Sequence, residues 1–277
     1  MSAKSAEILK LMFWNIKGNE DTYPLIASYI TQFDVDMCVL AEMPYGTTYR
    51  LQAKLPSGYT FQELPSDKAK IKYIYNQRIE SKFIDDAPQG RGSMLSLKLN
   101  NGTQINLVGC HLLDSINHGA SERCHFAQLF SAFISGHEAE LNNDMTIVIG
   151  DFNMNPFEEG MAAAYAFNAV MDKSIAKRKP RKYKGKAYPY FFNPMWHFYG
   201  HPIHANGTIY YNSSNKGTLY YWNLYDQILL RASLCSSFRY DDIGIVKQID
   251  KTNLLTNRGG INKDISDHLP IYINLKI

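Results

Sequence analysis

Six segments of the chain place small polar or ionisable residues where a run of apolar residues ends or begins. The clearest is TIVIGDFNMNP, residues 146–156, in which a β-branched apolar run is followed by Asp151 and Asn153. Gly150 and Pro156 favour a turn at this point. The other five segments carry Asn15, Glu42, His111, Asp226, and the neighbours Asp267 and His268.

These residue types suit a divalent cation combined with acid–base chemistry. Carboxylate and amide oxygens are hard ligands that fit Mg²⁺ or Mn²⁺. The two histidines add proton transfer or positive charge near neutral pH. Any one of these residues alone is more often a solvated or structural side chain. Six recurrences at strand ends, with no lysine among them, favour a common site.

Strand-like segments must position these residues. They are residues 8–14, 37–43, 71–76, 91–99, 104–110, 145–150, 225–230 and 270–277. Alternating polarity, as in MLSLKL, is typical of a strand with one wet face, whereas continuous apolar runs are typical of central strands.

Two segments between the strands have helical spacing, residues 22–33 and residues 121–141. In the longer one we expect Ser121 to be the N-cap. We expect its buried stripe to contain Phe126, Leu129, Phe130 and Phe133. Because no repeat or Gly/Ser linker divides the chain, residues 1–277 are predicted to form a single α/β domain.

Composition excludes several classes of protein. The chain has 277 residues, of which 45% are hydrophobic and 20% charged, an ordinary globular balance. No run approaches the ~20 apolar residues that a membrane span needs. The N-terminus lacks the apolar core of a signal peptide. The four cysteines form no CxxC motif, so we expect reduced thiols in a cytoplasmic protein.

An elaborated basic and aromatic insertion is predicted near residues 177–220. Residues 177–186, KRKPRKYKGK, contain seven Lys or Arg, and the aromatic stretch YPYFFNPMWHFYGH follows at 188–201. The basic run is most simply a solvated loop. The alternative is a contact with a phosphate backbone, although a net charge of +3 does not mark the whole chain as a nucleic-acid binder.

The motifs NIKG, LAEM, CHL, GDFNMNP, YDQILL and SDHLPI together resemble the endonuclease/exonuclease/phosphatase superfamily. They occur in the order of that family and span residues 15–268. The family includes deoxyribonucleases, abasic-site endonucleases, deadenylases, sphingomyelinases and inositol-polyphosphate 5-phosphatases. The resemblance implies a four-layer α/β/β/α sandwich of two mostly antiparallel sheets with outer helices and a site at one sheet edge.

The resemblance also implies a metal site. Glu42 is similar to the main metal ligand of the family, with Asn15 and Asp267 close by. Mg²⁺ would keep several waters, as it usually does. Lys17 stands where many nucleases of the family have an acidic residue, which weakens the case for a second metal position.

The catalytic roles follow from the same resemblance. Asp151 and Asn153 resemble the pair that positions the attacking water or protonates the leaving oxygen, and strand alternation would put both on one face. His268 resembles the histidine beside the phosphate, and Asp226 the carboxylate that orients it. His111 resembles the histidine that donates to a non-bridging phosphate oxygen.

We therefore expect a metal-dependent phosphoester hydrolase, with a nuclease acting on nucleic acid favoured. Arg91, Arg123 and Lys72 are further candidates for phosphate contacts. A phosphatase or small-molecule phosphodiesterase is the main alternative, because the fold does not choose the substrate. A catalytically inactive binding module is disfavoured because every candidate catalytic residue is present.

The histidine-rich stretch HFYGHPIH, residues 197–204, raises the alternative of a zinc site. It holds three histidines within eight residues, but no cysteine joins them. A polar loop is therefore the favoured interpretation.

Overall fold

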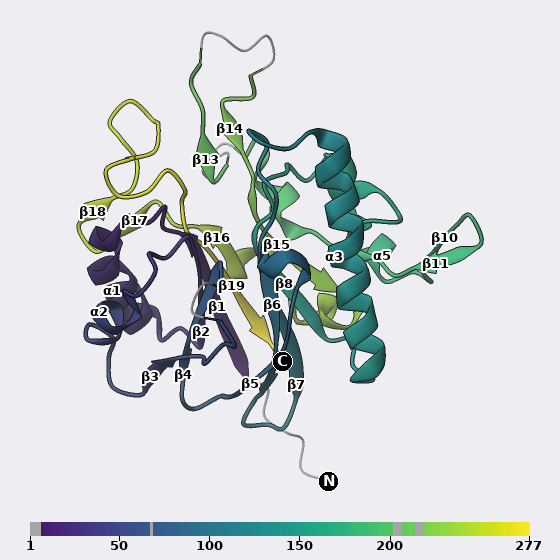
Figure 1. Cartoon of the computed structure of the whole chain (residues 1–277), viewed down its shortest axis with the longest axis horizontal. Helices are drawn as coiled ribbons and strands as arrows, with labels where there is room; N and C mark the ends of the chain where they lie inside the picture. Colours follow the sequence, from purple (N-terminus) through teal and green to yellow (C-terminus); the bar gives the residue numbers. More distant parts are fainter. Residues whose placement is uncertain (1–6, 67–68, 202–206, 214–218) are drawn as a thin grey trace.

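Two large sheets form the centre of the molecule and pack face to face (Figure 1). The computed structural model describes residues 7–66, 69–201, 207–213 and 219–277. In spatial order, the first sheet contains β16 (Ile243–Ile245), β19 (Ile271–Lys276), β1 (Ile8–Asn15), β2 (Met37–Ala41), β4 (Ile71–Asn76) and β3 (Tyr59–Phe61). The second contains β5 (Glu80–Asp86), β6 (Gly92–Lys98), β7 (Gln104–His111), β8 (Thr146–Asp151), β15 (Asp226–Arg231), β12 (Phe191–Phe192) and β9 (Ala169–Val170).

Both sheets are mixed but predominantly antiparallel. The parallel pairs are β1 with β2, β7 with β8, and β9 with β12. Parallel pairing carries the chain across the outer face of a sheet between two strands, and helices occupy those crossovers. Thus α1 (Tyr23–Phe33) connects β1 to β2, and α3 (Ala120–Glu140) connects β7 to β8.

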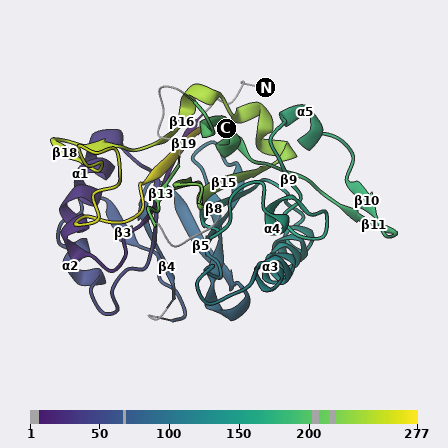
Figure 2. The same ribbon diagram turned by 90° about the horizontal axis from the view of Figure 1, so that it is seen from above.

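Helices cover the outer faces of both sheets (Figure 2). The first sheet is covered by α1 and α2 (Thr48–Gln52). The second is flanked by α3, α4 (Glu159–Ala162) and α5 (Lys173–Ala176). This arrangement confirms the expected four-layer sandwich. Within the described ranges, none of the helices has the length and apolar character needed to cross a bilayer.

The central strand β8 is buried on both faces, which explains its continuous apolar run. Ile147 and Ile149 point into the core between the sheets. Val148, on the opposite face, packs in a second core with Phe126 and Phe130 of α3. Because successive side chains of a strand point to opposite faces, β8 contributes residues to two separate cores.

The expected details of α3 are wrong at two positions. The N-cap is Gly119 and not Ser121, because the helix begins at Ala120 and no side chain caps it. Leu129 is 42% exposed. The buried stripe instead continues one turn further, to Ile134.

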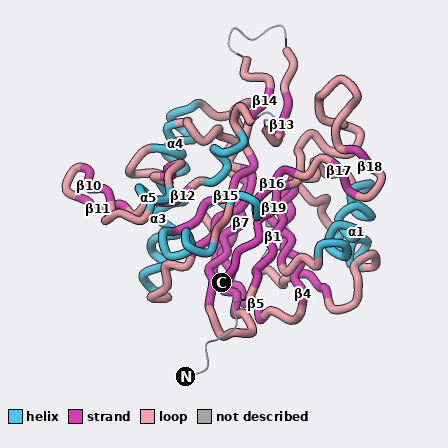
Figure 3. The backbone as a smooth tube through the Cα atoms, turned by 180° about the vertical axis from the view of Figure 1, so that it is seen from behind, coloured by secondary structure: helices cyan, strands magenta, loops and turns pink. Residues whose placement is uncertain are grey.

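One hairpin lies within the basic and aromatic insertion, and a second begins in it and ends just beyond it (Figure 3). One pairs β10 (Arg181–Tyr183) with β11 (Lys186–Tyr188), and the other pairs β13 (Ile209–Tyr210) with β14 (Trp222–Asn223). The basic run is therefore largely a paired hairpin and not a simple loop. A third small hairpin joins β17 (Gln248–Ile249) to β18 (Thr252–Asn253).

A buried tyrosine joins the two sheets. The hydroxyl of Tyr73, on β4, donates to the Ser93 carbonyl oxygen at 2.7 Å. It accepts the backbone N–H of Gly109 at 3.0 Å and the hydroxyl of Ser93 at 3.1 Å. A Cβ atom at position 109 would lie 2.6 Å from that hydroxyl oxygen. Glycine is thus required for the close approach, two residues before β7 ends at His111.

Replacing Tyr73 by Phe should lower the free energy of unfolding by about 1–3 kcal/mol, because a buried N–H loses its acceptor. Urea unfolding followed by circular dichroism measures this change. Tyr75→Phe, on the same strand, is the matched control, since the Tyr75 hydroxyl has no hydrogen-bond partner among the described residues. Equal stability of the two variants would contradict the role of the Tyr73 hydroxyl.

Candidate active site

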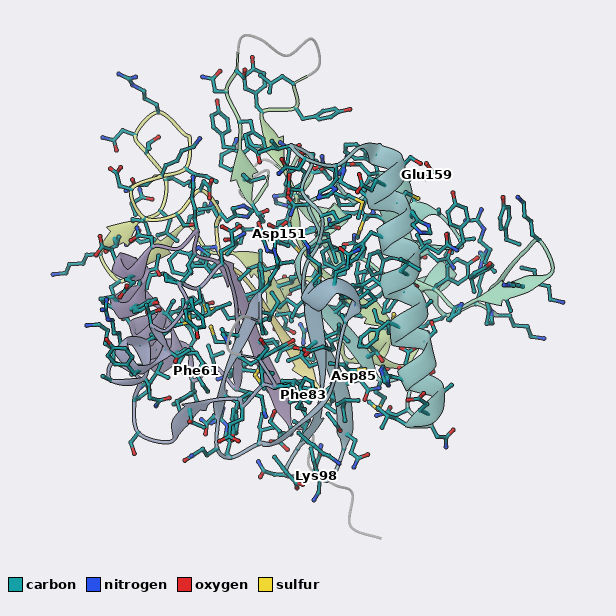
Figure 4. All side chains as sticks on the ribbon, viewed as in Figure 1. Phe61, Phe83, Asp85, Lys98, Asp151 and Glu159 are labelled. Carbon is teal, nitrogen blue, oxygen red and sulfur yellow. The ribbon has the colours of Figure 1, made fainter. Side chains whose placement is uncertain are left out.

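The strand register brings the candidate residues of the second sheet together. His111 and Asp151 are paired at the ends of the parallel strands β7 and β8. Asp151 is also paired with Asp226, at the start of the antiparallel strand β15. Figure 4 shows Asp151 at the upper edge of the sandwich, at the opposite end from Lys98. Three candidate side chains therefore meet at one edge.

The first sheet delivers its candidates to the same edge. Asn15 ends β1 and is paired with Ala41, the last residue of β2, so that Glu42 follows directly. The Nδ2 atom of the buried Asn15 donates to Glu42 Oε1 at 2.9 Å and to Asp151 Oδ2 at 3.2 Å. Its Oδ1 atom accepts the Lys17 N–H at 3.0 Å. One amide thus links carboxylates from both sheets.

Glu42 has a left-handed backbone, with φ of 55°, which is uncommon for a residue other than glycine. Its carbonyl oxygen accepts the N–H of Gly18 at 2.9 Å, which holds the turn. The side chain is 40% exposed, and its Oε1 atom lies 3.4 Å from His111 Nε2. The carboxylate is therefore fixed on its inner side and open to water on its outer side.

The oxygen donors at this edge fit a divalent cation such as Mg²⁺. Glu42 offers an accessible carboxylate beside that of Asp151, and the open side leaves room for the waters that Mg²⁺ retains. Asp267 lies nearby but forms an ion pair with Lys17, with Nζ to Oδ2 at 2.6 Å. In this arrangement Asn15 positions Glu42, because its own oxygen already accepts a hydrogen bond.

A buried ion pair lies behind these carboxylates. His268 Nδ1 lies 3.0 Å and 2.8 Å from the two carboxylate oxygens of Asp226. His268 Nε2 lies 3.9 Å from Asp151 Oδ2. The Asp226 N–H donates to the Thr208 hydroxyl oxygen at 3.1 Å. The imidazole is thereby oriented with Nδ1 toward Asp226 and Nε2 toward the site.

The surroundings favour a charged His268. Burial opposes protonation of this imidazole, but the adjacent Asp226 carboxylate, with Asp151 beyond it, raises the pKa of His268 to about 10. Burial raises the pKa of Asp226 to about 6, although the positive charge of His268 acts against this. At neutral pH the pair is therefore an imidazolium and a carboxylate.

The charge state of His111 differs from that of His268. Burial lowers its pKa, while Asp151 and Glu42 act in the other direction and Arg91 and Lys70 reinforce the lowering. The imidazole is thus neutral near pH 7 and serves as a hydrogen-bond donor or acceptor. Sequence reasoning missed Lys70, because nothing in the chain around it marks its approach to His111.

Arg91 is the cation best fixed beside His111. Its carbonyl oxygen accepts the His111 N–H at 2.8 Å, and its Nη1 atom donates to the Leu112 carbonyl oxygen at 3.2 Å. Arg123, in contrast, is buried. It donates to the Asn153 carbonyl oxygen at 2.7 Å and pairs with Glu158 at 2.9 Å, and both contacts support the loop that follows β8.

Asn153 does not continue the strand alternation that the sequence suggested. The strand β8 ends at Asp151, and Asn153 has φ of 52°. Its N–H donates to Asp151 Oδ1 at 2.8 Å, and its side-chain Nδ2 donates to the Leu112 carbonyl oxygen at 3.2 Å. Asn153 therefore lies beside Asp151 through a left-handed turn, which orients the carboxylate.

An aromatic surface adjoins the site through the β13–β14 hairpin. Ile209 of β13 forms a bridge with His268. Burial, and then the nearby Tyr225 and Asp151, raise the pKa of Tyr211. The exposed rings of Phe157 and Tyr220 lie further out, with centroids 5.5 Å apart. The sequence identified the aromatic insertion but not its place beside the candidate active site.

The zinc alternative finds no support in the described residues. The rings of His197 and His201 lie 5.0 Å apart, and His204 lies outside the described ranges. Among the described residues, the His, Cys, Asp and Glu side chains grouped closely enough to hold a metal are Asp151, Asp226 and His268. Asp226 and His268 already satisfy each other, which leaves the exposed carboxylate of Glu42 and the buried carboxylate of Asp151 as the remaining oxygen donors.

Comparison with solved structures identifies this architecture. TDP2 of D. rerio, in a complex with single-strand DNA product, is 18% identical over 98% of this chain and 100% of its own, with a TM-score of 0.59. An endonuclease/exonuclease/phosphatase family protein of Bacteroides thetaiotaomicron is 15% identical over 99% and 96%, with a TM-score of 0.61. A mannosyl-6-phosphatase of the same species is 15% identical over 96% and 98%, with a TM-score of 0.58.

Sequence comparison gives no further relative, since no protein-family model and no curated protein sequence matches the chain. The structural matches nevertheless cover almost the whole chain. The two mixed sheets and the outer helices agree with this fold. The chain has the fold of the endonuclease/exonuclease/phosphatase superfamily.

Proposed function

We propose that the protein is a metal-dependent phosphodiesterase that cleaves nucleic acid by in-line attack of water. The observation that carries the proposal is that two acidic groups and two imidazoles, one charged and one neutral, lie together at one sheet edge. Glu42 is accessible, Asp151 is buried beside it, His268 is charged and His111 is neutral. Hydrolysis of a phosphoester uses these capacities together.

Each residue has a distinct part in this mechanism. A divalent cation bound at Glu42 would offset charge on the phosphate. Asp151 accepts a hydrogen bond from the attacking water and orients it toward phosphorus. His268 presents its Nε2 proton to the charge that develops on the phosphate, while Asp226 holds its tautomer. His111 donates to a non-bridging oxygen as a neutral imidazole, and Asn15 holds both carboxylates in place.

The surroundings support a nucleic-acid strand as substrate. Arg91 and Lys70 lie near His111 and can contact neighbouring phosphates. The aromatic surface beside the β13–β14 hairpin flanks the other side of the site, and bases stack on such rings. The match to a TDP2 bound to single-strand DNA product agrees with this choice. A small phosphoester is the second candidate, because a mannosyl-6-phosphatase has the same fold.

Replacing Asp226 by Asn should move the alkaline limit of activity to lower pH. The raised pKa keeps His268 protonated below about pH 10, so activity that needs the imidazolium is lost as the pH rises through that value. Without the Asp226 charge, burial lowers the pKa, and kcat/KM at pH 8 should fall by roughly 10²–10⁴-fold. The pH–rate profile measures this, with the exposed Asp264→Asn as control. An unmoved alkaline limb would contradict the assignment.

Replacing Glu42 by Gln should weaken Mg²⁺ binding by at least ~10-fold, because the main charged ligand becomes a neutral amide. Isothermal titration calorimetry measures the affinity directly, and the Mg²⁺ dependence of turnover provides a second readout. Glu63→Gln, at an exposed carboxylate away from the edge, is the control. Wild-type Mg²⁺ affinity in the Glu42 variant would exclude Glu42 as the metal ligand.

A further inference from the structure

The β10–β11 hairpin is a preformed element outside the candidate active site. Its two-residue turn, Lys184 and Gly185, has φ values of 45° and 78°. Positive φ at both positions is typical of the type I′ turn, which matches the twist of paired strands. The hairpin projects from the body beyond α3, at the end of the molecule opposite the first sheet (Figures 1 and 2).

The pairing register places cations and tyrosines on one face of this hairpin. Arg181 is paired with Tyr188, and Tyr183 with Lys186. Side chains directly opposite each other in an antiparallel pair lie on the same face. Alternation puts both pairs on a single face, which we name the tyrosine–cation face, and turns Lys182 to the other side.

A pocket of about 440 Å³ lies between this face and the body. This volume is within the range of ~300–1,000 Å³ typical of small-ligand sites. The pocket is lined by Tyr183, Lys184, Lys186 and Tyr188 of the hairpin, and by Tyr165 and Gln128 of the body. The Tyr165 and Tyr183 ring centroids are 6.0 Å apart. The Tyr165 hydroxyl donates to Glu159 at 2.5 Å, which fixes that wall.

The base of the hairpin is anchored in the core. Asn168 Nδ2 donates to the Tyr188 carbonyl oxygen at 3.1 Å, and Arg231 Nη1 donates to the Pro189 carbonyl oxygen at 3.2 Å. Arg231 is itself buried and pairs with Glu138 of α3 at 2.8 Å. A ligand therefore meets an ordered surface and loses little affinity to ordering it.

The positive charge of this region is not neutralised by the protein. The seven Lys and Arg side chains of residues 177–186 form no ion pair with any described carboxylate. Two carboxylates of neighbouring segments accept hydrogen bonds from other groups, Glu159 from Tyr165 and Asp172 from Ser174. Since the net charge of the whole chain is only +3, residues 177–186 concentrate a local excess of positive charge.

We propose that the tyrosine–cation face is a second, non-catalytic binding site for single-stranded nucleic acid. A single strand offers alternating phosphates and accessible bases, which match alternating cations and aromatic rings. A duplex keeps its bases stacked inside and would use only the cations. An acidic protein would likewise need the charges but not the facing rings of Tyr165 and Tyr183.

Fluorescence anisotropy with a fluorescein-labelled oligothymidylate, in EDTA to prevent cleavage, tests the site. Combined Arg181→Glu and Lys186→Glu should weaken binding at least ~10-fold at low salt and reduce the slope of log affinity against log salt by about 1.4. Tyr183→Ala should weaken binding by about tenfold, and Tyr183→Phe should retain it, because stacking needs the ring alone.

Matched controls come from the opposite side of the molecule. Lys54→Glu and Tyr49→Ala, at an exposed lysine and an exposed tyrosine, should leave binding unchanged. Hydrolysis of bis-p-nitrophenyl phosphate by the hairpin variants should stay at the wild-type rate. Wild-type affinity in the hairpin variants would overturn the proposal, as would a poly-glutamate peptide that competes as well as unlabelled oligonucleotide. Binding is measured without turnover. The binding result therefore stands whether or not the protein hydrolyses phosphoesters as proposed.

Discussion

The hydrogen bonds of the buried Asn15 amide set the constraint on which the site depends. They hold a carboxylate from each sheet at one edge, with Glu42 at 2.9 Å and Asp151 at 3.2 Å. Two sheets that slid against each other would separate these groups. Tyr73 limits such movement from within the core, where its hydroxyl bonds across to Ser93 and Gly109. The chemistry of the edge is therefore coupled to the packing of the whole sandwich.

The two histidines at this edge have different charge states. His268 is buried against Asp226 and is charged, whereas His111 is partly buried without an equally close carboxylate and is neutral. Neighbouring groups with pKa values driven apart by their environments are typical of acid–base catalysis. The left-handed backbone at Glu42 adds local strain, which commonly accompanies functional positions.

Much of the fold could be predicted because burial leaves a periodic pattern in the sequence. Residues 71–76 form β4 with the expected bounds, and the polar residues that follow apolar runs do gather at one edge. Periodicity does not report where a strand stops, however. The alternation of strand side chains ends before Asn153, where the backbone makes a left-handed turn. Leu129 faces solvent because the buried face of α3 is narrower than its apolar residues suggest.

Contacts between segments that are far apart in the sequence were harder to predict, because periodicity does not report which segments pack together. Lys70 precedes β4 of the first sheet, and its charge acts on His111 of the second sheet because the two sheets pack together. The β10–β11 hairpin has no apolar alternation, so its lysines suggest a solvated loop. Its pairing depends on the Lys184–Gly185 turn and on anchors such as Arg231, which is far away in the sequence.

The most direct test of the proposed chemistry is a turnover measurement on purified protein with Mg²⁺, Mn²⁺ or EDTA. The substrates are single-stranded DNA, RNA, supercoiled DNA, bis-p-nitrophenyl phosphate and a sugar phosphate, with His268→Ala run in parallel. The account predicts cleavage of nucleic acid that requires the cation and is lost in the His268 variant. Cleavage that persists in EDTA or in His268→Ala, or hydrolysis of the sugar phosphate alone, would contradict it.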